Sequence, residues 1–273
     1  MTDQQRHDQE PSRHSDTTWP SHLPQSADRA GPNRRAMLLG GIGIGGLAIG
    51  TGLTLATQHA LAAAPSTPVV PATEELMTDH GLLKRILLIY RECADRLNTG
   101  DELDPAALFH SAQMVHSYIE DFHEGIEEGY IFPRLLRAGK LRDTIRNLLI
   151  QHDVGRKLTI AVIQSSTTMD MPGTGAAPGF ATAESRAALA RTLNQFITMY
   201  EPHEAREDTV VFPAFRDVTA DGSVFDQVSE QIAEAQQKRF GDQGMSGYLD
   251  QVDRIEQQLG IHDLAGFTPP IPN

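Results

Sequence analysis

Two short stretches of the sequence repeat one arrangement of residues that can bind a metal ion. His123 is followed four residues later by Glu127, and His203 is followed four residues later by Glu207. Each stretch then ends in Phe-Pro at the same distance from its histidine. Residues four apart share a helix face, because four residues turn a helix by about 400°. Two such pairs on facing helices predict a carboxylate site for two metal ions inside a bundle.

One further histidine precedes each pair, His80 before the first pair and His152 before the second. His80 and His152 fall on the apolar faces of two other predicted helices, and each is followed four residues later by a basic residue, Lys84 and Arg156. One histidine on an apolar helix face is usually a core residue with a hydrogen-bond partner. Four such histidines on four helices, accompanied by two carboxylates, indicate a shared function instead.

The donor types point to metal binding. Burying an unpaired carboxylate costs several kcal/mol, and too few basic residues lie on the predicted apolar faces to neutralise both glutamates. A pair of divalent or trivalent cations would restore the balance. Imidazole and carboxylate together suit iron, zinc, manganese or copper, and a mixed set with two glutamates able to bridge favours two iron ions.

The helices that must position these donors are indicated by apolar residues spaced three and four apart. Asn98-Thr99-Gly100 stops the first helix, and Asp104-Pro105 is a typical start for the second. Pro202 falls inside the fourth helix, where we expect a kink or bulge. The predicted helices span about residues 73–97, 105–138, 141–163 and 189–211, with shorter amphipathic helices at about 225–240 and 248–259.

This order of motifs resembles the hemerythrin family, the HHE cation-binding domain, over about residues 73–217. The resemblance implies an all-α fold, an antiparallel up-down four-helix bundle with one or two additional C-terminal helices. It also implies two non-haem iron ions, bridged by carboxylates and an oxo or hydroxo group, with an open position for dioxygen. The ligands that it carries over are His80, His123, Glu127, His152, His203 and Glu207.

Three neighbouring residues leave alternatives open. Arg156 stands where oxygen-carrying hemerythrins have a fifth histidine, and it either hydrogen-bonds a carboxylate or bound peroxide or extends to solvent. Those carriers place the last carboxylate five residues after its histidine, which here is Asp208. Glu207 is preferred because on a regular helix it points closer to His203. Glu120 is expected to hydrogen-bond a ligand imidazole.

Several functions remain compatible with this site. The first is reversible binding of dioxygen or a related small ligand, and the second is an enzyme that consumes hydrogen peroxide or nitric oxide. The third is a structural bundle with adventitious metal. The sequence leaves open whether the protein is an enzyme, and it does not fix the oligomeric state.

Composition excludes other classes. The formal net charge of −13 argues against nucleic-acid binding, which needs a basic face. The single cysteine, Cys93, excludes an intramolecular disulfide.

The N-terminal part resembles an export signal. Arg34-Arg35 precede a glycine-rich apolar run at about 38–56, and Ala62 and Ala64 follow at signal-peptidase spacing. This resembles a twin-arginine signal, and the alternative is an uncleaved membrane anchor. The predicted parts are a polar leader and signal at 1–64, a linker at 65–72, the helical bundle at 73–217 and a C-terminal helical extension at 218–273.

Overall fold

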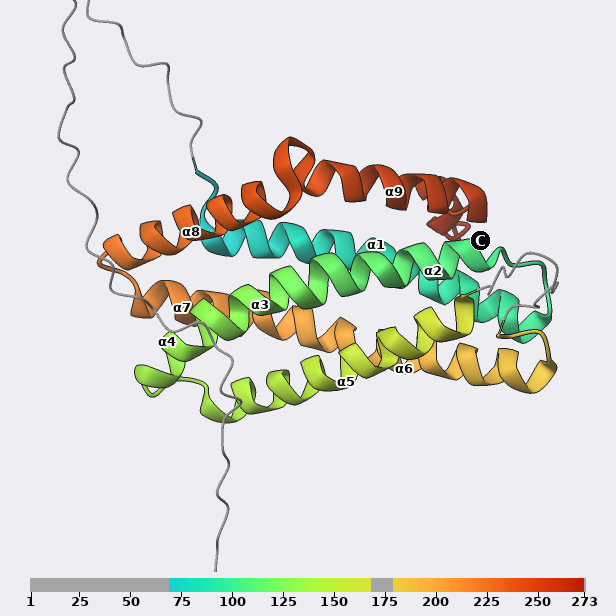
Figure 1. The fold of residues 1–273 in the computed structure, drawn as a ribbon, viewed down its shortest axis with the longest axis horizontal. Coiled ribbons are helices and arrows are strands. Elements are labelled where there is room, and N and C mark those ends of the chain that lie inside the picture. Colours follow the sequence, from blue (N-terminus) through green and yellow to red (C-terminus); the bar gives the residue numbers. More distant parts are fainter. Residues whose placement is uncertain (1–68, 168–178, 273) are drawn as a thin grey trace, which may run out of the picture. The chain divides into compact units, whose positions relative to one another are not determined.

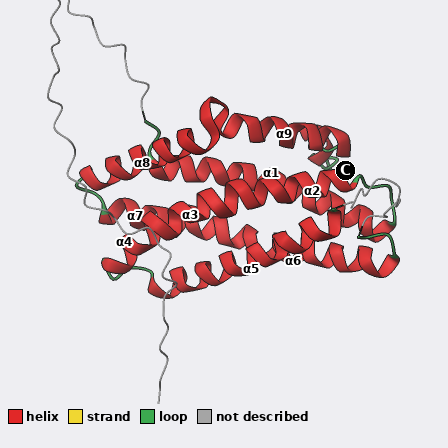
Figure 2. Ribbon diagram, viewed as in Figure 1, coloured by secondary structure: helices red, strands yellow, loops and turns green. Residues whose placement is uncertain are grey.

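The regular structure of the chain is helical throughout the part described. A computed structural model describes residues 69–167 and 179–272, and within these ranges it contains helices and loops but no strand (Figure 1, Figure 2). The predicted leader and signal at 1–64 lie outside the described residues, as does the first half of the predicted linker, 65–68. The all-α prediction is therefore confirmed for the described chain.

Long helical rods pack side by side in a helical bundle (Figure 1). The first rod is α1 (Ala72–Thr99) and the third is α5 (Arg142–Ser166). The second and fourth rods are interrupted by π-helical turns. The second rod contains α2 (Pro105–Met114), η1 (Val115–His123), α3 (Glu124–Ile126), η2 (Glu127–Ile131) and α4 (Phe132–Arg137). The fourth rod contains α6 (Ala183–Arg206), η3 (Glu207–Val211) and α7 (Phe212–Val218).

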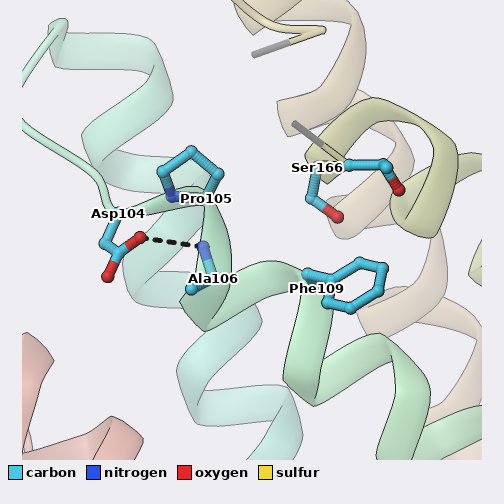
Figure 3. Close-up of a pocket in the computed structure, with 6 residues that line it drawn as sticks. Asp104, Pro105, Ala106, Phe109 and Ser166 are labelled. Carbon is cyan, nitrogen blue, oxygen red and sulfur yellow. Dashed lines mark hydrogen bonds between the residues drawn. The ribbon is translucent and has the colours of Figure 1, made fainter. Parts of the chain in front are cut away.

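The predicted helix ends follow from local chemistry. α1 ends at Thr99 and is followed by Gly100, whose φ of 83° is readily adopted by glycine. Asp104 caps α2 by accepting a hydrogen bond of 2.9 Å from the backbone N–H of Ala106, and Pro105 occupies the first helical position (Figure 3). The pocket of about 190 Å³ in Figure 3 is lined by this cap and the end of α5, far along the chain from the predicted ligands.

The π-helical turns η2 and η3 stand directly before the two Phe-Pro pairs. The N–H of Phe132 donates to the carbonyl of Glu127, and the N–H of Phe212 donates to that of Glu207, five residues back in both cases. A proline inside a helix has no N–H and its ring crowds the carbonyl four residues back, so the turn before Pro133 widens. The same reason applies to the fourth rod.

The distortion expected at Pro202 lies further along the chain. α6 continues as an α-helix through Pro202 to Arg206, and the π-helical turn η3 begins at the next residue. The wide turn is thus placed by the proline of the second Phe-Pro pair, Pro213, and not by Pro202.

The C-terminal extension packs along the bundle. α8 (Ser223–Phe240) packs on α1, and α9 (Gly244–Leu259) packs on α1 and α2, on the side away from α5 and α6 (Figure 1). Arg85 of α1 binds both carboxylate oxygens of Glu256, which attaches α9. Short 3₁₀ turns, η4 (Gly241–Gln243) and η5 (Leu264–Phe267), follow α8 and α9. Among the described helices, none combines the length and apolar character needed to cross a membrane.

Candidate metal centre

All six residues predicted as ligands meet in the interior of the bundle. Each side chain is buried, with at most 4% of its surface exposed. Their donor atoms form two groups, each with all atoms within 4.8 Å of one another. The first group is His80, His123, Glu127 and Glu207, and the second is Glu127, His152, His203 and Glu207. Because both glutamates belong to both groups, the cluster has the composition of a site for two cations with two shared carboxylates.

Each glutamate directs one oxygen to each group. Glu127 lies between His123 and His152, and Glu207 lies between His80 and His203. The Nε2–oxygen distances are 3.7 Å for His123 to Glu127 Oε1, 3.5 Å for His152 to Glu127 Oε2, 3.4 Å for His80 to Glu207 Oε2 and 3.2 Å for His203 to Glu207 Oε1. Each group can therefore offer a cation two imidazole nitrogens and two carboxylate oxygens.

The two glutamates have no hydrogen-bond partners among the described residues. All four of their carboxylate oxygens are buried and unpartnered, and so is Nε2 of His152. Buried polar atoms in proteins are nearly always paired, and an unpaired buried charge is costly. Two bound cations would satisfy these atoms, so the residues present fit a metal pair.

The electrostatics of the cluster show how it is neutralised without metal. Burial, reinforced by the charge of Glu207, raises the pKa of Glu127 well above its usual value. Burial also acts to raise the pKa of Glu207, but the neighbouring imidazoles of His203 and His80 outweigh it and hold that pKa low. Burial lowers the pKa of His80, yet its hydrogen bond to Asp208 and the neighbouring carboxylate of Glu207 raise it to about 9. Metal ions must displace protons from Glu127 and His80.

A hydrogen bond on the far side of each ring orients all four imidazoles. Each Nδ1 contacts a side-chain oxygen, which places the proton on Nδ1 and directs the lone pair of Nε2 into the cluster. Three acceptors are carboxylates and one is an amide. The pairs are His80–Asp208 at 2.7 Å, His123–Asp79 at 3.1 Å, His152–Glu128 at 2.9 Å and His203–Gln151 at 2.9 Å.

The phenylalanine of each Phe-Pro pair packs on one of these rings. Phe132 stacks on His152 with ring centres 5.8 Å apart, and Phe212 stacks on His80 at 5.6 Å. The π-helical turns position these aromatic rings one turn beyond the glutamates. The Phe-Pro repeat in the sequence therefore has a role in holding the imidazoles.

The structure places Asp208 and Arg156 outside the cluster. Glu207 is fully buried within it, whereas Asp208 is partly exposed and bonds the outer nitrogen of His80. Arg156 also lies outside, at 2.8 Å from Glu128 and 2.8 Å from Glu124. Of the roles considered for Arg156, the structure shows the contact with carboxylates.

The expected role of Glu120 was wrong. Its Oε2 is 3.0 Å from Nδ1 of His116, which is not among the predicted ligands, and its Oε1 has no partner among the described residues. Glu120 could not reach the outer nitrogen of His123 because Asp79 of the neighbouring rod occupies that position. A contact between two helices replaced the one expected within a single helix.

Three hydrogen-bond partners of the imidazoles were not predicted, namely Asp79, Gln151 and Glu128. The signal for them lay in the internal repeat. Asp79 and Gln151 each directly precede the histidine of the first or third rod, and Glu128 directly follows Glu127. Their importance depends on which side chain of a neighbouring helix they face.

Two ion pairs repeat between the halves of the bundle. Lys84 lies 3.0 Å from Oε2 of Glu204, and Arg156 lies 2.8 Å from Oε2 of Glu124. Tyr200 adds a hydrogen bond of 2.8 Å by donating its hydroxyl to the other oxygen of Glu124. Burial raises the pKa of Glu124 well above its usual value, although Arg156 acts to lower it.

Comparison with known protein families finds a match over part of the chain. Residues 72–182 match the hemerythrin HHE cation binding domain. The matched segment includes His80, His123, Glu127 and His152. His203 and Glu207 lie beyond it and complete the cluster in the structure.

Three uncharacterized mycobacterial proteins are similar to this chain. One is from Mycobacterium bovis and two are from strains of Mycobacterium tuberculosis. Each is 46% identical over 203 residues, which cover 73% of this chain and 74% of the relative. No solved structure matches the chain.

Proposed function

We propose that this chain is a non-haem di-iron protein that binds dioxygen or a related small ligand. In this proposal the four rods form an antiparallel up-down bundle of the hemerythrin type, and the six-residue cluster holds two iron ions. The observation that carries the proposal is the pair of shared glutamates, whose four buried oxygens have no partner among the described residues.

The surroundings of the cluster support binding of two similar ions. Each ion would receive two imidazoles and two carboxylate oxygens, a mixed nitrogen and oxygen set that suits iron. Four protein donors leave coordination positions for a small ligand. When bound, such an iron pair would exchange electrons with that ligand. The chain's own contribution is orientation, because hydrogen bonds and stacked phenylalanines hold the imidazoles.

A redox enzyme acting on hydrogen peroxide or nitric oxide is the second candidate. The observation that favours it is the equal division of the four histidines between the two groups. With Arg156 bound to Glu124 and Glu128, no fifth imidazole occupies that position. Both ions would then keep exchangeable positions, which suits turnover.

Metal analysis tests the proposal directly. We expect two iron ions per chain after aerobic purification, and an absorption band from an oxygen bridge between the irons. His203→Ala should remove most of the iron, whereas His116→Ala, a half-exposed histidine outside the cluster, should leave it in place. A metal-free wild-type protein, or equal iron in both variants, would contradict the proposal. Peroxide consumption, compared with a stable and reversible oxygenated spectrum, separates the enzyme from the carrier.

We also propose that the protein is exported by the twin-arginine route, which places it outside the cytoplasm or on the membrane. The support is the Arg34-Arg35 pair, followed by the apolar run and Ala62 and Ala64. Replacing both arginines by lysine should retain the protein in the cytoplasm. Unchanged export of that variant would contradict this route.

A further inference from the structure

We propose that the pocket between α5 and α6 is the port through which the small ligand enters. This α5–α6 pocket has a volume of about 330 Å³, and Thr144, Asn147, Gln151, His203 and Arg206 are among the residues that line it. The ion that the ligand meets is the one held by His152 and His203. The inference rests on the proposed function and names which side of the metal pair is accessible.

His203 separates this pocket from the cluster. Its side chain lines the pocket, while its Nε2 lies 3.2 Å from Glu207 inside the cluster. Gln151, which is half-buried, covers the outer nitrogen of His203 with a hydrogen bond of 2.9 Å. A rotation of the Gln151 side chain would therefore expose the outer nitrogen of this imidazole to the pocket.

The equivalent position in the other half of the bundle is deeply covered. Asp79, the partner of His123, is fully buried and accepts a hydrogen bond of 2.9 Å from Tyr118. Gln236 of α8 donates to the Tyr118 hydroxyl, and Phe240 stacks on the Tyr118 ring with centres 5.0 Å apart. The C-terminal helices thus close the side of the cluster that corresponds to the pocket.

The remaining two imidazoles are covered by aromatic rings and charged groups. Phe212 stacks on His80, whose outer nitrogen bonds Asp208. Phe132 stacks on His152, whose outer nitrogen bonds Glu128. A small molecule that approached either ring would have to displace a packed side chain and a carboxylate.

The character of the hydrogen-bond partners points to the same ion. His80, His123 and His152 bond carboxylates, whereas His203 bonds the neutral amide of Gln151. A carboxylate partner makes an imidazole a stronger donor. The ion held by His203 is consequently the less strongly bound of the two, and it lies beside the pocket.

Filling the pocket tests the port. Asn147 is an exposed residue of α5 that lines the pocket, so Asn147→Trp should block it without disturbing the core. With azide as the probe of the iron-loaded protein, stopped-flow absorbance should show both the association and the dissociation rate lowered. We expect each rate to fall by about tenfold, which is within the range over which association rates vary among mutants of one site. Because a blocked path slows entry and exit alike, the Kd should not change.

A matched control uses the same helix. Ile150→Trp places an indole on an exposed residue of α5 that does not line the pocket, and the azide rates should equal those of the unmodified protein. If Asn147→Trp retains both irons and binds azide at the original rates, or if it changes the Kd without slowing both rates, the port is wrong. The proposed function fails separately, by the absence of iron.

A second variant addresses the less strongly held ion and does not depend on the pocket being filled. Gln151→Glu keeps the shape of the side chain and gives His203 a carboxylate partner. Loss of the first iron to a chelator should slow by about tenfold, the lower end of the effect of such partners. Gln195→Glu, an exposed residue of α6, makes the same charge change and should have no effect. An unchanged or faster loss from Gln151→Glu would overturn the assignment.

Discussion

The two halves of the bundle supply the same residue types to the candidate metal cluster but surround them differently. The half formed by the first two rods provides His80, His123 and Glu127, and the half formed by the last two provides the same donor types at matching positions. Their surroundings differ, since Asp79 of the first half corresponds to Gln151 of the second. Donor type is fixed by the metal, whereas the residues behind the donors can vary.

One difference between the halves is in side-chain size. Gly155 of the third rod packs directly against the ring of Tyr200, and a β-carbon on Gly155 would fall 2.8 Å from the Cζ of that ring. The matching positions in the first half hold a buried leucine, Leu83, and Glu120. A glycine beside a tyrosine in the second half thus corresponds to two side chains of more similar size in the first, so the two halves reach close packing by separate routes.

The largest effect is expected where the halves are equivalent. Glu127→Gln and Glu207→Gln should each lower iron affinity by about 100-fold or more, because even residues that only orient a ligand contribute 10- to 100-fold. Without metal, Glu127→Gln should change the stability little, because Glu127 is protonated there, whereas Glu207→Gln should destabilise the fold by about 3 kcal/mol, since it removes a carboxylate paired with His80. Iron content and thermal unfolding of the metal-free protein measure the two effects.

Equal losses of iron from the two variants would support the equivalence of the halves. Loss of both irons in one variant and of a single iron in the other would break it. His116→Gln serves as the control, because His116 is half-exposed and lies outside the cluster.

The next effect distinguishes the two ion pairs. Arg156→Ala should destabilise the fold by about 2–3 kcal/mol, somewhat below the usual range for breaking a buried pair, because Arg156 is one-third exposed. Glu124 would remain buried with Tyr200 as its hydrogen-bond partner. Urea unfolding at neutral pH measures the loss, and a change below about 0.5 kcal/mol, the size of a surface substitution, would contradict it.

The same variant should depend on pH in a defined direction. Burial raises the pKa of Glu124 above 4.5, so its charged form destabilises the folded state at neutral pH. As the pH falls through that raised pKa towards 4.5, Glu124 takes up a proton in the folded state and the penalty disappears. The stability difference between Arg156→Ala and the unmodified protein should therefore shrink with acidification. A difference that grew would contradict this account.

A smaller effect tests the difference in side-chain size. Gly155→Ala should cost about 1–3 kcal/mol, because the added methyl group overpacks against Tyr200. In a Tyr200→Leu background the cost should largely vanish. Gly81→Ala is the control, since a β-carbon there meets nothing within 4 Å, and it should stabilise α1 by about 0.5–1 kcal/mol. A double-mutant cycle without coupling would show that the packing is not shared.

The smallest effect is expected at the other ion pair. Lys84 corresponds to Arg156 but is 55% exposed, and solvent weakens its interaction with Glu204. Lys84→Ala should cost at most about 1 kcal/mol. Equilibrium unfolding would measure it beside Arg156→Ala, and a larger cost for Lys84→Ala would reverse the order that burial predicts.

Most of the helices, and the convergence of the six candidate ligands, could be predicted from the sequence because the signals for them are local. Helix period and the spacing of His123 to Glu127 act within one helix, so they can be read along the chain. Asp104 and Gly100 marked helix ends through equally local chemistry. The six predicted ligands therefore met in the structure as the resemblance implied.

The remainder depended on contacts between helices. Asp79 bonds His123 rather than a residue of its own helix, and this contact left Glu120 with His116 instead of a ligand imidazole. The relative rotation of two rods decides such contacts, and helix period does not determine it. The π-helical turn was misplaced because Pro202 and Pro213 both lie in the fourth rod, and local rules did not rank them.

The internal repeat has a consequence for how small such a protein can be. A single helical hairpin, the first two rods, carries His80, His123 and Glu127, which is half of the donor set. Two identical hairpins related by a two-fold axis would present the same four imidazoles and two carboxylates. A homodimer of half-length chains is thus a minimal design for this centre, in which subunit association and metal uptake would be one event.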